Sequence, residues 1–156
     1  MINNISLIED DILLNFLEDF KNSELSPQEF INKKKKYLFE TDDVSLIKNY
    51  VYSFMCIDEK KAENKTRKRE IVKARQIAMF FAKLKSKKSL NYIGKSIGGK
   101  DHATVLHAIK VVNNLIETKD PEFYEIIKKL SFDFGVYELS DEMKKIQWEI
   151  IVKRKK

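Results

Sequence analysis

The chain of 156 residues carries 30 Lys and Arg against 24 Asp and Glu, a formal net charge of +6, and is 43% hydrophobic. This length and apolar content suit one packed domain with a smaller extension and exclude a wholly disordered chain. The single Cys excludes an internal disulfide framework and a Cys-based zinc site. No apolar run approaches the roughly 20 residues of a membrane span, so we expect a cytoplasmic protein without a membrane partner.

The charge is distributed unevenly along the chain. Residues 1–59 hold 6 basic and 12 acidic side chains, residues 60–119 hold 16 and 4, and residues 120–156 hold 8 of each. A segment as basic as 60–119 is typical of a surface that binds nucleic acid. It is equally typical of a lysine-rich face exposed to solvent, and charge alone leaves both interpretations open.

The first part of the chain predicts three helices. Apolar residues recur at three- and four-residue spacing over 5–21, which indicates an amphipathic helix. The Ser-Pro pair at 26–27 is typical of a helix start, and it predicts a second helix that ends near Phe39. We expect Asp42 or Asp43 to cap a third helix.

The basic middle of the chain begins with an expected loop. Residues 60–70 hold six basic side chains and almost no apolar ones, which predicts an exposed basic loop or arm. A fourth helix is expected from Ile71 to about Lys85, because apolar residues again recur at helical spacing.

A pair of helices joined by glycines follows. Ser89 is expected to cap a short helix that ends at Gly98 and Gly99, and a longer helix starts near Lys100 or Asp101. Two helices joined by a short glycine turn have the form of a helix-turn-helix. At the start of its second helix, Asp, His and Ala side chains suit base edges in the major groove, although they equally suit the cap of an ordinary surface helix.

The end of the chain predicts two more helices. One starts at residues 120–122 and runs to about Leu130, and the last begins at Asp141 before a basic tail. Nothing alternates with the period of two that strands require. The predicted fold class is therefore all-α: a helical bundle with a helix-turn-helix and extra N-terminal and C-terminal helices.

Three motifs follow one another over residues 75–108. They read Arg75-Gln76-Ile77-Ala78-Met79, Ser89-Leu90-Asn91-Tyr92-Ile93-Gly94 and Gly98-Gly99-Lys100-Asp101-His102-Ala103-Thr104-Val105-Leu106-His107-Ala108. Together they resemble the C-terminal DNA-binding domain of the bacterial replication initiator DnaA. The resemblance spans about 42–130 and implies a fold similar to the Trp repressor.

The resemblance also implies which residues contact double-stranded DNA. It implies that Arg67 enters the minor groove, that Asp101, His102 and Ala103 read bases in the major groove, and that Lys83 adds a further major-groove contact. The implied phosphate contacts come from Arg75, Gln76, Leu90, Asn91, Thr104 and His107, with Leu90 and Asn91 acting through their backbone amides. Lys100 adds charge beside phosphate or guanine.

Three positions depart from the family pattern. Ala103 stands where the family has Thr or Ser, so it keeps a methyl group and lacks a hydroxyl. Lys100 replaces an Arg, which gives a point charge in place of a bidentate fork. Val111 stands where a charged residue is usual, and we expect it to pack inward. Duplex DNA remains the expected partner.

The sequence predicts no enzyme, cofactor, metal or nucleotide site. The run at residues 94–96 looks like the end of a phosphate-binding loop, but it lacks the first glycine and follows no strand. The two histidines, His102 and His107, are five residues apart and lie on different helix faces, and no Cys accompanies them, so a zinc site is not expected. No Ser-His-Asp or paired-carboxylate arrangement is present.

We therefore predict a nucleoid-associated, sequence-specific DNA-binding protein that acts in replication initiation at origins or in transcription regulation. Full-length family members carry a large ATPase domain before this one, whereas about 41 residues precede the match here. The expected domains are an acidic extension at 1–41, the DNA-binding domain at 42–133, and a C-terminal helix and basic tail at 134–156.

Other interpretations stay open at this point. One is a protein–protein interaction module that has the same fold and has lost base reading. Another is an RNA-binding or nucleoid-coating protein that acts by charge alone. The N-terminal helices are a candidate surface for a second copy or a partner protein, and the target sequence and the biological process are undetermined.

Overall fold

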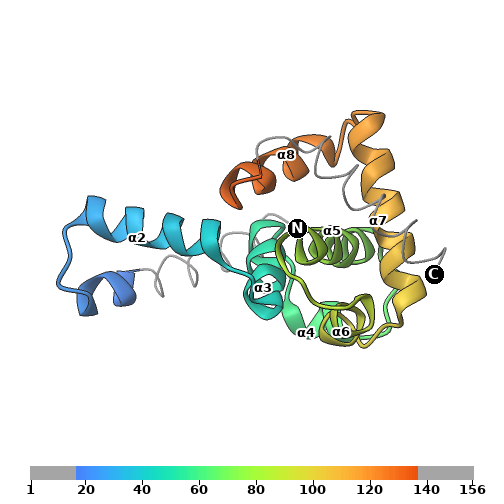
Figure 1. Cartoon of the computed structure of the whole chain (residues 1–156), viewed down its shortest axis with the longest axis horizontal. Helices are drawn as coiled ribbons and strands as arrows, with labels where there is room; N and C mark the ends of the chain where they lie inside the picture. Colours follow the sequence, from blue (N-terminus) through green and yellow to red (C-terminus); the bar gives the residue numbers. More distant parts are fainter. Residues whose placement is uncertain (1–16, 137–156) are drawn as a thin grey trace.

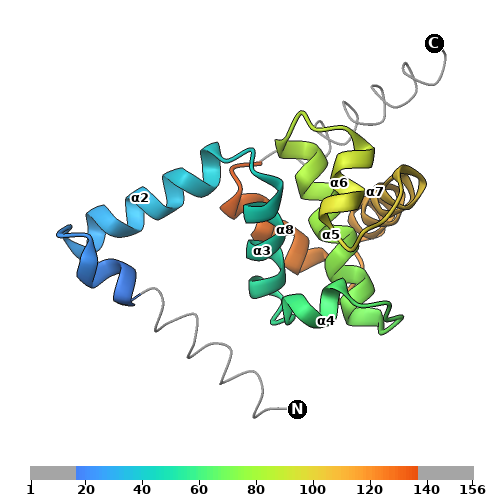
Figure 2. The ribbon, with the colours of Figure 1, turned by 90° about the horizontal axis from the view of Figure 1, so that it is seen from below.

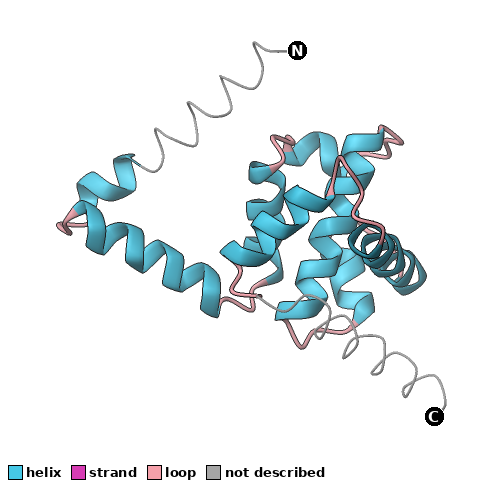
Figure 3. Ribbon diagram, turned by 90° about the horizontal axis from the view of Figure 1, so that it is seen from above, coloured by secondary structure: helices cyan, strands magenta, loops and turns pink. Residues whose placement is uncertain are grey.

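The computed structural model describes residues 17–136, and within that range it consists of helices and turns without a strand (Figure 3). Residues 17–22 are helical. The remaining helices are α2 (Pro27–Glu40), α3 (Val44–Phe54), α4 (Glu59–Glu63), α5 (Arg69–Lys85), α6 (Leu90–Ser96), α7 (His102–Glu117) and α8 (Tyr124–Asp133). The predicted all-α class is confirmed.

Helix α5 forms the centre of the body. It packs against α3, α4, α6 and α7, and Ile77, Ala78, Phe80 and Phe81 on it are fully buried. A helix that is buried around most of its circumference needs neighbours on every side. Helices α4 and α6 lie on one side of α5 and α8 lies on the other, while α7 runs past α5 and contacts both α6 and α8 (Figure 1).

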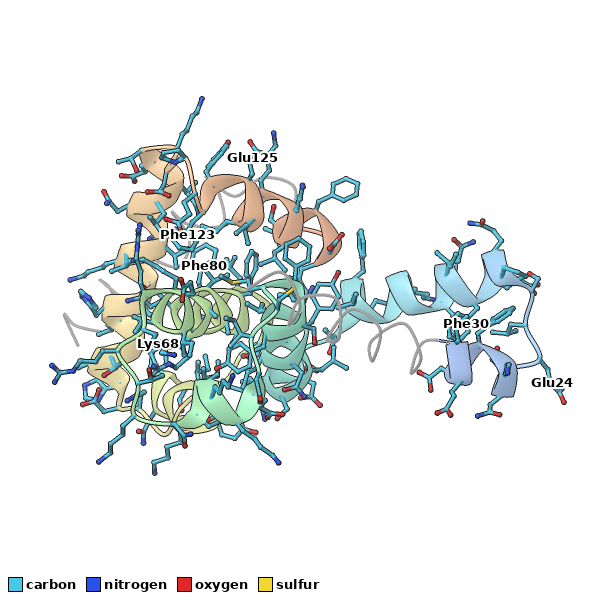
Figure 4. All side chains as sticks on the ribbon, turned by 180° about the vertical axis from the view of Figure 1, so that it is seen from behind. Glu24, Phe30, Lys68, Phe80, Phe123 and Glu125 are labelled. Carbon is cyan, nitrogen blue, oxygen red and sulfur yellow. The ribbon has the colours of Figure 1, made fainter. Side chains whose placement is uncertain are left out.

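Helix α2 and the helical residues 17–22 form an arm that stands away from this body (Figure 2). Phe30 packs edge-to-face on Phe20 with ring centroids 5.4 Å apart, and it is buried within the arm (Figure 4). The arm meets the body at Lys85, whose Nζ donates to the carbonyls of Phe39 at 2.8 Å and Phe134 at 2.7 Å. These carbonyls lie at the C-terminal ends of α2 and α8, where the helix dipole favours a positive charge. Burial lowers the pKa of Lys85.

The expected helix starts rest on side-chain caps that the structure contains. Ser26 and Glu29 form a capping box, in which Ser26 Oγ accepts from the amide of Glu29 at 3.3 Å and Glu29 Oε2 accepts from the amide of Ser26 at 3.0 Å. Asp43 caps α3, Ser89 caps α6 and Asp101 caps α7. Local sequence was sufficient for these starts because a cap acts within three residues.

Two boundaries differ from the sequence prediction. The expected basic loop at 60–70 is shorter, because Asp58 caps the one-turn helix α4, whose Ala62 is fully buried, and because α5 already begins at Arg69. The helix expected from residue 120 begins at Tyr124, since the Asp120 carboxylate accepts the amides of residues 122 and 123 in a turn.

Two further expectations concern other parts of the chain. The first sixteen residues, which hold most of the expected helix at 5–21, and the expected helix from Asp141 lie outside the described residues. Within 17–136, no helix combines the length and apolar character needed to cross a membrane. Residues 41–43 connect α2 and α3, and the domain boundary at 41–42 stays a prediction.

Candidate nucleic-acid interface

Helices α6 and α7 are joined by a glycine turn, and a third glycine lies beneath it in α6. Gly98 and Gly99 have φ values of +76° and +60°, which L side chains rarely adopt. Gly94 lies within α6, and a Cβ there would be 2.4 Å from the carbonyl oxygen of Lys100. The amide of Lys100 donates to the carbonyl of Gly94 at 2.7 Å. The turn is therefore packed directly on α6, and the two helices form a helix-turn-helix.

The first turn of α7 presents the predicted base-reading residues to solvent. Val105, Ala108 and Ile109 face the core, and this leaves His102 and Ala103 exposed. Along the same helix, Thr104 and His107 are also exposed, and Val111 packs against the core as expected. An exposed helix start after a tight turn is the geometry of a recognition helix.

Asp101 serves as the cap of this helix. Its Oδ1 accepts from the amide of Thr104 at 2.8 Å and from the hydroxyl of Thr104 at 2.7 Å. These two bonds lower the pKa of Asp101, so the exposed carboxylate is charged at neutral pH. Because both bonds use Oδ1, the other oxygen is left for a donor on a ligand.

The loop between α4 and α5 carries Arg67 in an exposed position. Arg75, which we expected to contact phosphate, lies beneath this loop with 7% of its surface exposed, and its Nη2 donates to the carbonyl of Thr66 at 2.6 Å. The structure thus gives Arg75 a task inside the free protein, which is to hold the loop. Gln76 is half-buried and accepts from Lys73 Nζ at 3.3 Å.

The remaining predicted residues surround the helix-turn-helix. Asn91 is exposed and Leu90 is half-buried at the start of α6, where the first amides of a helix lack an intrahelical acceptor. Lys100 is half-buried in the turn, and Lys83 is half-buried in the last turn of α5.

The structure adds a group of residues that the sequence did not indicate. Lys48 on α3 has 11% of its side chain exposed and pairs with Glu59 at 3.0 Å and Glu63 at 3.4 Å. Burial lowers the pKa of Lys48, but the two carboxylates outweigh it and raise the pKa above its usual value. Glu63 Oε2 accepts from the amide of Gly98 at 2.9 Å. The partners are 15 and 35 residues apart in sequence, so no local pattern signals them.

Among residues 17–136, no three His, Cys, Asp or Glu side chains lie close enough together to hold a metal ion.

Comparison with known proteins matches this part of the chain to one family. Residues 44–112 match the family described as "Bacterial dnaA protein helix-turn-helix". The match begins at the first residue of α3 and ends within α7, so it includes the glycine turn.

Several curated proteins are similar to this chain, all with the name chromosomal replication initiator protein DnaA. The protein of Flavobacterium psychrophilum is 43% identical over 108 residues, which are 67% of this chain and 22% of that protein. The protein of a Brugia malayi Wolbachia is 44% identical over 87 residues, which are 56% of this chain and 19% of that protein. The Bacteroides thetaiotaomicron protein is 52% identical over 66 residues, which are 42% of this chain and 14% of that protein. The chain thus spans about a fifth of these relatives. No solved structure matches it.

Proposed function

Because residues 44–112 match the helix-turn-helix of the bacterial DnaA family, we propose that this protein binds double-stranded DNA with sequence preference through α6 and α7. The observation that carries the proposal is the exposed first turn of α7, which follows the double-glycine turn and carries Asp101, His102 and Ala103. This turn lies within the segment 60–119, where basic side chains outnumber acidic ones 16 to 4.

In the proposed complex, the first turn of α7 enters the major groove. The free carboxylate oxygen of Asp101 accepts from N4 of cytosine, and the methyl group of Ala103 contacts the thymine methyl. His102 donates to a base edge or accepts from one. Each well-placed base contact contributes about 1–3 kcal/mol of discrimination between base pairs.

The loop at 64–68 supplies the proposed minor-groove contact. Arg67 is exposed on it, and a narrow A·T-rich minor groove attracts an arginine by its concentrated negative potential. Lys83 is proposed as an additional major-groove contact. Side chains and amides around the helix-turn-helix hold the phosphates in this proposal: Gln76, Leu90, Asn91, Lys100, Thr104 and His107. Arg75 is buried and contributes by holding the loop that carries Arg67.

We further propose that the protein acts without catalysis, as a cytoplasmic protein associated with the nucleoid. The relatives' name, chromosomal replication initiator protein, favours a role in replication initiation. Regulation of transcription uses the same kind of DNA contact and is the second biological setting we propose.

Selection of a binding sequence from randomised duplexes tests the proposed function. We expect one sequence to be enriched, and fluorescence anisotropy to give a steep fall in its affinity with salt, because bound phosphates release counterions. Enrichment of no sequence over a scrambled duplex would refute sequence-specific binding, and a flat salt dependence would refute binding to the DNA backbone.

Single substitutions connect this binding to the proposed surface. We expect His102→Ala to weaken binding to the selected duplex far more than binding to a scrambled duplex. We expect Arg67→Ala to weaken binding to duplexes that contain the A·T-rich part of the selected site. Lys128→Ala is the matched control, because Lys128 is exposed on α8, on the other side of α5 from α6 (Figure 1). It removes one positive charge and should leave sequence preference unchanged.

The competing hypothesis is a protein–protein interaction module that retains the fold alone. It predicts that replacing Asp101 and His102 leaves the affinity for DNA unchanged. The segment 1–59, which holds twice as many acidic as basic side chains, is the part of the chain on which such a partner, or a second copy of the chain, is proposed to dock.

A further inference from the structure

The two proposed reading elements, the loop at 64–68 and the turn before α7, are distant in sequence and are joined by one residue. Glu63 is the last residue of α4, so it directly precedes the loop that carries Arg67. Its Oε2 accepts the amide hydrogen of Gly98, 35 residues away, at 2.9 Å. Any displacement of α4 is thereby transmitted to the turn that sets the start of α7.

The carboxylate of Glu63 is itself held in place. Lys48 Nζ donates to Glu63 Oε1 at 3.4 Å, and it lies 3.5 Å from the carbonyl oxygen of Ser96 at the end of α6. With 11% of its side chain exposed, Lys48 has little freedom to move, and Glu59 pairs with it at 3.0 Å. One buried cation therefore connects α3, α4 and α6 and orients Glu63 toward the turn.

Arg75 provides a second connection between the same two elements. Its Nη2 holds the carbonyl of Thr66 in the loop at 2.6 Å. Its Cδ lies 3.2 Å from the point that a Cβ of Gly98 would occupy, so the same side chain packs beneath the turn. Loop and turn are thus fixed relative to each other from two sides.

The sign of the charge on Glu63 sets this residue apart from its surroundings. It is one of 4 acidic residues among the 60 residues that hold 16 basic ones. A carboxylate beside a surface that binds DNA repels phosphates and lowers affinity for any sequence. Its hydrogen bond to the turn acts in the opposite direction, because it preserves the geometry that sequence-specific binding needs.

We propose that Glu63 is a positioning residue for DNA recognition, whose hydrogen bond to the Gly98 amide sets the spacing between Arg67 in the minor groove and α7 in the major groove. This inference rests on the proposed function. It adds that the minor-groove and major-groove contacts form together at one fixed spacing. The protein therefore recognises the distance between an A·T-rich step and the base pairs under α7.

Glu63 has two opposing effects on binding, so the direction in which the affinity changes tests the proposal. We expect Glu63→Ala to bind the selected duplex about 3- to 10-fold more weakly, the loss typical of one intramolecular hydrogen bond. The same variant should bind a scrambled duplex as tightly as the parent or more tightly, because a negative charge is gone. Glu63→Gln keeps one oxygen acceptor for the Gly98 amide but loses the ion pair with Lys48, and it should bind the selected duplex more tightly than Glu63→Ala.

Glu59→Ala is the matched control. It removes the same charge and a partner of the same Lys48, but no hydrogen bond joins Glu59 to the turn in the described structure. We expect it to retain the full preference for the selected duplex. Thermal unfolding of all three variants reports their stability, and exchange of the Gly98 amide, measured by NMR without DNA, should accelerate in Glu63→Ala and not in Glu59→Ala.

A duplex series then measures the spacing directly. The A·T-rich step is moved by one base pair in either direction from the remainder of the selected site. The parent should prefer one spacing, and the differences in affinity among the three duplexes should be smaller for Glu63→Ala, in which the Arg75 contacts remain. If Glu63→Ala keeps both the affinity and the spacing preference, or if Glu59→Ala loses them equally, the positioning role is wrong. A parent protein that prefers no sequence would instead refute the proposed function.

Discussion

Gly94→Ala is the substitution for which helix propensity and tertiary structure predict opposite results. In an ordinary helix, alanine in place of glycine stabilises by about 0.5–1 kcal/mol, because glycine loses more backbone entropy on folding. Gly94 lies inside α6, so the sequence alone would predict a gain. The structure predicts a loss.

The magnitude follows from the contact with the turn. The new Cβ would lie 2.4 Å from the carbonyl oxygen of Lys100 and 3.0 Å from that of Asp101, and both are backbone atoms. Overpacking of this kind costs about 1–3 kcal/mol. If the turn moves away, the 2.7 Å bond from the Lys100 amide to Gly94 is lost, which costs about 0.5–1.5 kcal/mol. After the gain in propensity, we expect a net loss of about 1–3 kcal/mol.

Thermal unfolding measures this loss, and a decrease in Tm of about 3–10 °C is expected for a chain of this size. Gly99→Asn is the control, because nothing lies within 4 Å of a Cβ at Gly99 and Asn tolerates its φ of +60°. That variant should unfold close to the parent temperature. An unchanged or increased Tm for Gly94→Ala would refute the close packing of the turn on α6.

Three further substitutions test the core and the arm. Asn113→Leu should raise the free energy of unfolding by about 1 kcal/mol, because both polar side-chain atoms of Asn113 are buried without a hydrogen-bond partner in the described structure. Urea titration measures this change, and a lower free energy of unfolding would mean that the Asn113 amide is hydrogen-bonded. Gly135→Ala should separate the arm from the body, since its φ is +74° and a Cβ would be 2.5 Å from the Phe39 ring; faster proteolysis at residues 39–43 is expected, and an unchanged rate would contradict the contact. Burial and a 2.6 Å hydrogen bond to Asp133 raise the pKa of Tyr50. The stability that neutral Tyr50 gives the fold is therefore complete below the unfolded pKa of about 10 and is lost as the pH rises toward the folded pKa. Tyr50→Phe should weaken this loss of stability at alkaline pH in thermal scans, and an identical pH profile would refute the link between Tyr50 ionisation and stability.

The sequence predicted those features that depend on neighbouring residues. Helix starts at Ser26, Asp43 and Ser89 follow from a side chain that accepts an amide two or three residues later. The glycine turn at 98–99 follows from a backbone conformation that other residues avoid. Both kinds of signal are complete within a few residues, so the tertiary structure had little to add.

The features that the sequence missed depend on contacts between distant segments. Arg75 has the spacing and charge of a solvent-exposed phosphate contact, and only the position of the Thr66 carbonyl shows that its guanidinium is buried. Lys48 belongs to a helix whose other buried residues are apolar or aromatic, and its buried position depends on Glu59 and Glu63 on another helix. A basic residue is ordinarily exposed, so its burial was not expected from sequence.

The cap at the start of α7 limits how this protein can acquire a new specificity. Asp101 holds the helix start through Thr104, and in the proposed complex the same carboxylate reads a base. Asp, Asn, Ser, Thr and Gly are the residues that cap helices well, so most other replacements at this position lose the helix start together with the old preference. Positions 102 and 103 carry no such second duty in the described structure. In a diverging lineage, changes of target sequence should therefore accumulate first at 102 and 103, while position 101 drifts within a small set of residues.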